Sequence, residues 1–286
     1  MEFGITLFTS DRGITPAAAA QAAERFGFDS FYVPEHTHIP VRRDAAHPQT
    51  GDETLPDDRY MRTLDPWVAL GTAVSVTERI RLGTAVALPV EHDPITLAKT
   101  IASLDHLSGG RVTLGVGYGW NLDELTDHGV PTGKRRTMLR EYLEGMQALW
   151  SQQEASYSGE FLSFGPSWAW PKPIQQPRVP IIVGAAGNEK NFKWIARAAD
   201  GWMTTPIEQD IDDNVLLLRK TWEAAGREGS PRIVVLDRKP VPETLARWED
   251  LGVDEVVYGL PDADEATVVA YLERLAGKLG RSSAAG

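Results

Sequence analysis

Cysteine is absent from this chain of 286 residues, and its absence excludes disulfides, thiolate nucleophiles, iron–sulfur clusters and cysteine-ligated zinc. Long apolar runs are also absent, because no stretch approaches the roughly 18 consecutive apolar residues that a membrane-spanning helix needs. The N-terminus lacks the basic and apolar regions of a signal peptide. These absences predict a cytoplasmic protein with no membrane partner.

Positive charge is scarce as well. The chain has 29 basic and 40 acidic residues, which gives a net charge of -11. Such a surface repels the phosphates of nucleic acids, so we expect no nucleic-acid partner. A local basic group can still bind an anionic cofactor tail, since net charge describes the whole surface and not one cleft.

Three common catalytic motifs are missing from the sequence. It has no Gly-x-Ser-x-Gly elbow, no Walker loop and no Gly-x-Gly-x-x-Gly that follows a strand. Acyl transfer, nucleoside triphosphate hydrolysis and a Rossmann-type dinucleotide site therefore lack support.

What the sequence does contain is an alternation of short β-branched runs with amphipathic helical segments, which is typical of βα units around a parallel sheet. With 42% hydrophobic residues, the chain can bury the core of a single α/β barrel of roughly 250 residues. We predict a (β/α)₈ TIM barrel with inserted loops, forming one domain over residues 1–280 and followed by a flexible tail, 281–286. The eight expected strands are 3–8, 30–33, 80–88, 112–116, 180–183, 201–204, 233–236 and 255–258.

The helix expected to begin at Asp93-Pro94 carries four apolar residues that we place along one buried side: Ile95, Ala98, Ala102 and Leu107.

Two connections are longer than simple turns. Residues 37–64 follow the second strand, and they form either a lid over the site or a solvent-exposed loop without that role. Residues 151–179 contain a small hairpin around 157–161, which we expect to cover the bottom or the side of the barrel.

Two glycine-rich segments follow expected strands at the end of the barrel where cofactors bind. Gly184, Ala185, Ala186, Gly187 and Asn188 precede a helix, and they form either a phosphate cradle or an ordinary capped turn. The second segment opens space for a planar ring, or its glycines merely relieve crowding. Its members are Gly117, Tyr118, Gly119, Trp120 and Asn121.

Glu35 and His36 directly follow the second strand, where an imidazole beside a carboxylate suits proton transfer. Together with His38 they can also begin a metal site. The ends of the fifth and sixth strands supply no histidine and the eighth ends without an aspartate, so a set of three or more ligands is not assembled convincingly. We therefore predict no metal.

Taken in order, these motifs resemble the luciferase-like monooxygenase superfamily, and in particular its F420-dependent oxidoreductases. The resemblance covers nearly the whole chain. Its carriers are residues 23–30 (AERFGFDS), 35–36 (EH), 81–86 (RLGTAV), 104–111 (LDHLSGGR), 114–117 (LGVG), 183–187 (VGAAG) and 199–202 (ADGW).

The resemblance implies a barrel that is commonly a homodimer, with a flavin or deazaflavin ring on a bulge in the third strand. The bulge contains a cis peptide, which by match is Ala85-Val86. Phosphate contacts fall by match on the backbone of residues 185–188, with residues 117–121 nearby. His36 matches a histidine that contacts the reactive region of the deazaflavin in sugar-phosphate dehydrogenases.

Two departures bear on cofactor and chemistry. Tyr118 stands where flavin-using luciferases carry an arginine for the FMN phosphate, which favours coenzyme F420 over the alternative, FMN. Trp120 stands where the sugar-phosphate dehydrogenases carry a catalytic glutamate, which argues against their substrate. The remaining acid–base candidates are His36, Glu35 and Asp123, in that order.

The sequence therefore predicts hydride transfer between F420 and a small organic substrate. The rival functions are an FMN-dependent monooxygenase that uses reduced flavin and oxygen, a non-catalytic cofactor-binding protein, and a metal-dependent hydrolase that uses Glu35, His36 and His38.

Overall fold

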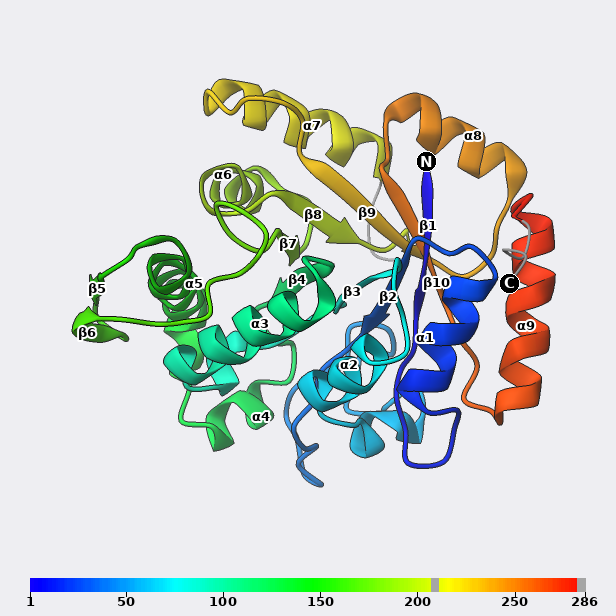
Figure 1. The fold of residues 1–286 in the computed structure, drawn as a ribbon, viewed down its shortest axis with the longest axis horizontal. Coiled ribbons are helices and arrows are strands. Elements are labelled where there is room, and N and C mark those ends of the chain that lie inside the picture. The colour runs from blue at the N-terminus through cyan, green and yellow to red at the C-terminus, as the bar shows by residue number, and fades with distance from the viewer. Residues whose placement is uncertain (207–210, 282–286) are drawn as a thin grey trace.

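The computed structural model describes residues 1–206 and 211–281, and its centre is a closed barrel of parallel strands (Figure 1). The strand order around the barrel is β1-β10-β9-β8-β7-β4-β3-β2, which confirms the predicted (β/α)₈ architecture. The barrel strands are β1 (Glu2–Thr6), β2 (Ser30–Val33), β3 (Arg81–Thr84), β4 (Val112–Gly117), β7 (Ile181–Gly184), β8 (Gly201–Thr204), β9 (Arg232–Asp237) and β10 (Glu255–Gly259).

Helices surround the barrel, and α9 returns beside α1 to close the ring (Figure 1). Side chains that accept a backbone N–H begin several of them, among them Thr15, Asp65, Asp93 and Asp264. The helices are α1 (Pro16–Arg25), α2 (Pro66–Val74), α3 (Pro94–Ser108), α4 (Leu122–Asp127), α5 (Arg135–Ser151), α6 (Glu189–Ala198), α7 (Ile211–Ala224), α8 (Pro242–Leu251) and α9 (Glu265–Lys278). Three short 3₁₀ turns are η1 (Asp58–Arg62), η2 (Pro89–Glu91) and η3 (Thr132–Lys134). None of these helices is long and apolar enough to cross a membrane.

Apolar packing has two parts. A small cluster fills the barrel interior and includes Tyr32, Ile182, Met203, Val234 and Val257. A much larger cluster lies between the strands and the surrounding helices. One prediction about α3 was wrong in part: Ala98 and Ala102 are buried, but Ile95 and Leu107 are exposed. The buried side of α3 is formed instead by Leu97, Ala98, Ile101, Ala102, Leu104, Asp105 and Ser108.

The amino-terminal end of the barrel holds a buried ion cluster. Glu255 is fully buried, and its carboxylate lies 2.7 Å from the Arg232 guanidinium and 3.6 Å from that of Arg81. Glu2 pairs with both arginines, and these pairs lower its pKa although burial alone would raise it. Because this cluster lies at the opposite end from the strand carboxyl termini, we assign it to stability.

The two long connections have different places. Residues 151–179 contain a hairpin, β5 (Ala155–Ser158) and β6 (Ser163–Ser167), that packs on α5, where Leu162 covers Gly145 (Figure 1). The hairpin thus lies at the side of the barrel. Residues 37–64 extend over the barrel mouth and are described with the site. Of the expected tail, 282–286 lie outside the described residues.

Candidate cofactor site

Strand β3 breaks after Thr84 into the expected bulge. The Ala85 N–H donates to Val33 O at 2.8 Å and the Ala87 N–H donates to Gly115 O at 2.8 Å, so pairing resumes beyond Val86. The Ala85-Val86 peptide is cis, which confirms the expectation.

Glycines of the neighbouring strands make room for this bulge. A Cβ on Gly115 would lie 1.9 Å from the Thr84 carbonyl oxygen. A Cβ on Gly117 or Gly184 would lie 2.7 or 2.9 Å from the Val86 side chain. These glycines therefore leave space for Val86 at the barrel mouth. They contribute to the ring site indirectly, because they allow the bulge to form.

A cavity of about 390 Å³ lies above the bulge, at the carboxyl ends of the strands. This volume falls within the range of about 300 to 1,000 Å³ that is usual for cofactor and ligand pockets. The predicted residues that line it are Glu35, His36, Ala85, Val86, Gly117, Tyr118, Gly119, Trp120, Gly184, Ala185 and Ala186. Four predicted residues do not line it: Asn121, Asp123, Gly187 and Asn188.

The long segment 37–64 supplies one wall of the cavity, through His47, Pro48, Gln49 and Tyr60. His47 contacts the Trp120 ring edge-on at 4.7 Å between centroids, and its Nε2 lies 2.9 Å from the Tyr60 hydroxyl. Its Nδ1 accepts the Gln49 N–H, and burial lowers the pKa of His47. The segment thus covers the site with a neutral, aromatic surface.

His36 connects the cavity to a buried carboxylate. Its Nδ1 lies 2.8 Å from Oε2 of Glu124, whose side chain is fully buried on α4. With Nδ1 bound there, the other ring nitrogen, Nε2, is the one left to face a ligand in the cavity. The carboxylate therefore orients the ring.

A chain of polar contacts continues from Glu124 to the surface. Glu124 Oε1 accepts the Thr37 N–H at 2.9 Å, and the Thr37 hydroxyl lies 2.6 Å from Nε2 of His128 and 3.0 Å from Nδ1 of His38. His38 reaches Asp127 at the exposed end, with 3.0 Å between Nε2 and Oδ2. The Thr37 hydroxyl also lies 3.5 Å from Glu124 Oε1, so polar contacts connect His36 to the surface through Glu124 and Thr37.

Glu91 lies beside this chain with both carboxylate oxygens buried, and neither has a hydrogen-bond partner in the part of the chain that the structure describes. Nε2 of His128 lies 3.8 Å from Glu91 Oε2, but burial lowers the pKa of His128, so this ring brings no charge at pH 7. Burial, together with the charges of Glu124 and Glu35, raises the pKa of Glu91 to about 9. The side chain is therefore neutral at pH 7.

The other two acid–base candidates, Glu35 and Asp123, use their carboxylates for hydrogen bonds within the protein. Glu35 accepts the Leu88 N–H at 2.6 Å with one oxygen and meets Nε2 of His92 at 2.6 Å with the other. Burial opposes the charge on His92, yet Glu35 raises the His92 pKa above its usual value. Asp123 accepts hydrogen bonds from the N–H groups of Asp44 and Ala45, both at 3.0 Å. It therefore connects α4 to the segment 37–64, which we call the covering segment.

The expected phosphate cradle caps α6. Asn188 accepts the Asn191 N–H at 2.9 Å, and the buried Asn191 amide donates to Ala186 O at 2.8 Å. Asn191 also accepts a hydrogen bond from Arg136 at 2.8 Å, and the Arg136 guanidinium lies 4.5 Å from the centre of the Tyr118 ring. Arg136 on α5 therefore places a cation beside Tyr118.

The three residues considered for a metal do not converge. Each of them contacts a different partner. The Glu35 carboxylate is hydrogen-bonded to the Leu88 N–H and to His92. His36 is hydrogen-bonded to Glu124, and His38 to Asp127. Within residues 1–206 and 211–281, no three His, Cys, Asp or Glu side chains are arranged to hold a metal ion. The hydrolase interpretation thus loses its ligand set.

Sequence reasoning missed Glu124, Glu91 and Arg136, because their partners lie far away in the chain: Glu124 is 88 residues from His36. Only one signal was available. Glu124 follows the glycine-rich segment after β4 by a few residues, so it had to lie near the same barrel mouth.

The fold is a (β/α)₈ barrel, and its candidate site is a cavity above a bulged strand with room for a planar ring. A family model described as luciferase-like monooxygenase matches residues 1–251. The chain therefore belongs to the luciferase-like monooxygenase family.

Relatives agree with this assignment. An uncharacterized protein of Mycobacterium tuberculosis is 71% identical over 98% of this chain and 99% of its own length. An F420-dependent glucose-6-phosphate dehydrogenase of Kineococcus radiotolerans is 34% identical over 73% of this chain and 58% of its own. Among solved structures, the monooxygenase RslO1 from Streptomyces bottropensis has the same fold, with a TM-score of 0.76 and 22% identity over 98% of both chains.

Proposed function

We propose that this protein is an F420-dependent oxidoreductase that transfers hydride between the deazaflavin and a small organic substrate. The observation that carries the proposal is the Val86 bulge, which forms the floor of a 390 Å³ cavity beside His36. The kinship with a dehydrogenase named for F420 supports this cofactor over FMN.

The residues present fit a ring with a phosphorylated side arm. The ring face would rest on Ala85 and Val86, and the phosphate would meet the backbone of Ala185 and Ala186. Arg136 adds positive charge beside them. A bound deazaflavin supplies a carbon centre that accepts or donates a hydride.

The chain's own residues supply position, proton and shielding. His36 Nε2 takes up or returns the proton that accompanies hydride transfer, while Glu124 holds the ring and balances its charge. His47, Tyr60 and Trp120 enclose the cavity and exclude water. Trp120 also presents an apolar face, which favours an apolar or aromatic substrate.

Titration of the purified protein with F420 and, separately, with FMN tests the cofactor. We expect F420 to bind at micromolar concentrations or below and FMN to bind much more weakly. Micromolar binding of FMN alone, with oxygen consumed in the presence of reduced flavin, would instead establish a flavin monooxygenase.

The variant His36→Ala separates an enzyme from a non-catalytic carrier. We expect it to retain F420 affinity within about threefold and to lower turnover by about a hundredfold or more, the usual scale of general acid–base catalysis. Redox change of the bound deazaflavin, followed by absorbance across a panel of small organic substrates, measures this. Equal rates for the variant and the unaltered protein would remove His36 from the mechanism.

A further inference from the structure

Five aromatic rings from separate parts of the chain meet at the ring cavity. Their centroids lie 4.7 to 6.3 Å apart, at tilted or edge-on angles. Such distances are those of favourable aromatic pairs. We call this set the aromatic wall, and its members follow strands β1, β2 and β4 or belong to the covering segment: Phe8, His36, His47, Tyr60 and Trp120.

No arginine or lysine lines the ring cavity within the described part of the chain. Two arginines of the covering segment bind acceptors of that same segment instead. Arg59 donates to both carboxylate oxygens of Asp57, at 3.0 and 2.7 Å. Arg43 donates to the carbonyl of Pro40 at 2.9 Å and to that of Glu53. The surface that a substrate would meet therefore lacks a cation from these side chains.

The fixed charges beside the aromatic wall are negative. Glu35 lines the cavity and is paired with His92, and Glu124 lies 2.8 Å from the His36 ring. Burial lowers the pKa of His47, so this ring is neutral at pH 7. A carboxylate or phosphate placed against this surface would lose its water and gain no positive partner, which is unfavourable.

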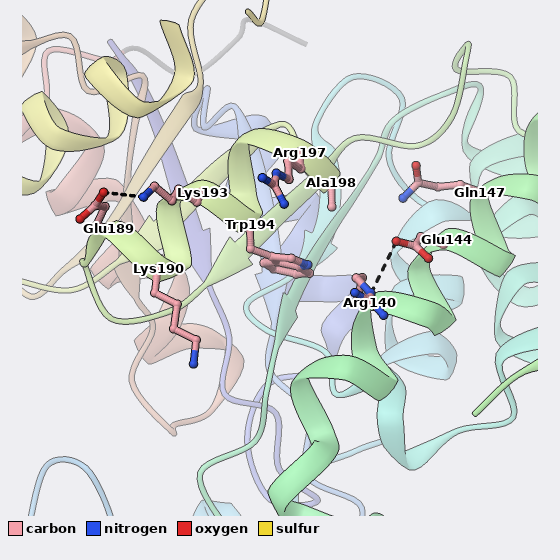
Figure 2. A pocket seen from close by; sticks show the side chains of 9 residues that line it. All are labelled: Arg140, Glu144, Gln147, Glu189, Lys190, Lys193, Trp194, Arg197 and Ala198. Atoms are coloured by element: carbon pink, nitrogen blue, oxygen red, sulfur yellow. Dashed lines mark ion pairs between the residues drawn. The ribbon is translucent and has the colours of Figure 1, made fainter. Parts of the chain in front are cut away.

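Cations of this part of the molecule gather outside the ring cavity. A separate cleft of about 640 Å³ lies between α5 and α6, and Figure 2 shows the side chains that line it. Its cations are Arg140, Lys190, Lys193 and Arg197, and none of them lines the ring cavity. The basic and the aromatic surfaces are therefore separate, and a substrate beneath the covering segment meets the aromatic one.

We propose that the substrate is an uncharged compound with an aromatic or alicyclic group, and that the aromatic wall selects it. This proposal rests on the proposed function and names the class of compound on which that function acts. The ring faces of the wall can bury such a group. A positively charged compound is disfavoured as well, because its charge would oppose the proton that His36 takes up during turnover.

Three related compounds test the charge of the substrate: acetophenone, its para-carboxylate and its para-aminomethyl derivative. Calorimetry measures their binding to the protein alone and to the protein with F420 bound, so the test needs no turnover. We expect acetophenone to bind at least about tenfold tighter than either charged derivative, because a charge loses its water in the cavity. Glucose-6-phosphate should give no binding heat.

Two variants of Trp120 test the aromatic wall. Trp120→Ala should weaken acetophenone binding by about tenfold or more, because the bound group loses apolar contact area. Trp120→Phe retains a ring and should stay within about threefold of the unaltered protein. Thermal unfolding shows whether each variant is folded. Equal affinities of the alanine variant and the unaltered protein would reject the wall as the selecting surface.

Gln49→Lys tests whether the missing cation excludes anions. Gln49 is exposed, lines the cavity and holds His47 through its backbone N–H, which the substitution retains. We expect the para-carboxylate to bind about threefold to fivefold tighter, with acetophenone almost unchanged. Gln153→Lys is the matched control, because Gln153 is exposed at the side of the barrel and does not line the cavity.

Failure of this proposal is distinguishable from failure of the proposed function. Tighter binding of either charged derivative, or no binding of acetophenone at millimolar concentration, would reject the substrate class and leave F420 as the cofactor. Binding of FMN without binding of F420, with acetophenone still preferred, would reject the proposed function and keep the substrate class.

Discussion

His36 combines two environments, since its side chain lines the cavity while its Nδ1 meets the buried Glu124. Such an arrangement fixes the tautomer and the orientation of the ring. The Glu124 carboxylate also anchors the Thr37 backbone, so the segment 37–64 and the polar contacts of His36 depend on one side chain. This dependence gives the first test at the scale of single residues.

Glu124→Gln retains the size and the hydrogen-bonding capacity of the side chain but removes its charge. We expect turnover to fall by about tenfold to a hundredfold while F420 affinity changes little, because the protonated imidazole loses its counter-charge. Asp123→Asn, one position earlier on α4, removes a carboxylate whose hydrogen bonds, among the described residues, go to Asp44 and Ala45 of the segment 37–64. A larger loss of turnover in Asp123→Asn than in Glu124→Gln would contradict our assignment.

Glu91 makes stability depend on pH. Its pKa rises from an ordinary 4.5 to about 9 on folding, so between these values the native state keeps a proton that the unfolded chain releases. The free energy of unfolding therefore falls as pH rises through this window. Glu91→Gln removes the effect, and its stability relative to the unaltered protein should grow by more than about 1 kcal/mol from pH 5 to pH 8. Urea unfolding at the two pH values measures this difference, and parallel stabilities would refute it.

At the scale of elements, the bulge of β3 depends on the glycines of its neighbours. Gly115→Ala would place a Cβ 1.9 Å from the Thr84 carbonyl oxygen, which is backbone and cannot rotate away. We expect a loss of about 1 to 3 kcal/mol or more in stability and weakened F420 binding, because the bulge must shift. Thermal unfolding and cofactor titration report the two effects.

Gly71→Ala is the matched control for Gly115→Ala. Gly71 is exposed on α2, and a Cβ there meets nothing within 4 Å. This substitution should raise stability by up to about 1 kcal/mol, because alanine favours a helix over glycine. A loss in both variants would mean that crowding at the bulge is not the cause.

Periodicity predicted the elements well, because each βα unit is a local pattern. Seven of the expected strands agree with the structure within about two residues, and only 80–88 was too long, since the bulge ends β3 at Thr84. No apolar pattern marks such a break. The exposed Ile95 and Leu107 were misplaced for a related reason: spacing along a helix cannot tell which neighbours cover it.

The part of the site that lies directly after the barrel strands could be predicted from the sequence. Glu35, His36 and the glycine-rich segments line the cavity because parallel strands bring their carboxyl ends together. Glu124, Glu91 and Arg136 were not predictable, since their roles depend on contacts between α4 or α5 and distant loops.

At the scale of the whole molecule, the two ends of the barrel have separate tasks. The mouth holds the cavity, whereas the opposite end holds the buried cluster around Glu255. Glu255→Gln should lower stability by about 3 to 5 kcal/mol, because Arg232 and Arg81 lose a buried counter-charge. Cofactor affinity should remain the same, and denaturant unfolding with F420 titration measures both.

Glu249→Gln gives the comparison for Glu255→Gln. Glu249 pairs with the N-terminal amine, and its side chain is 64% exposed, so the change should cost less than about 1 kcal/mol. Similar losses in the two variants, or weakened F420 binding in Glu255→Gln alone, would contradict the division of the barrel into a stabilising end and a binding end.

A crystal structure with bound F420 tests the central claim most directly. Our account predicts the ring against Ala85 and Val86 with His36 Nε2 facing it. A ring bound elsewhere on the molecule, or a barrel mouth that stays empty at saturating F420, would contradict it.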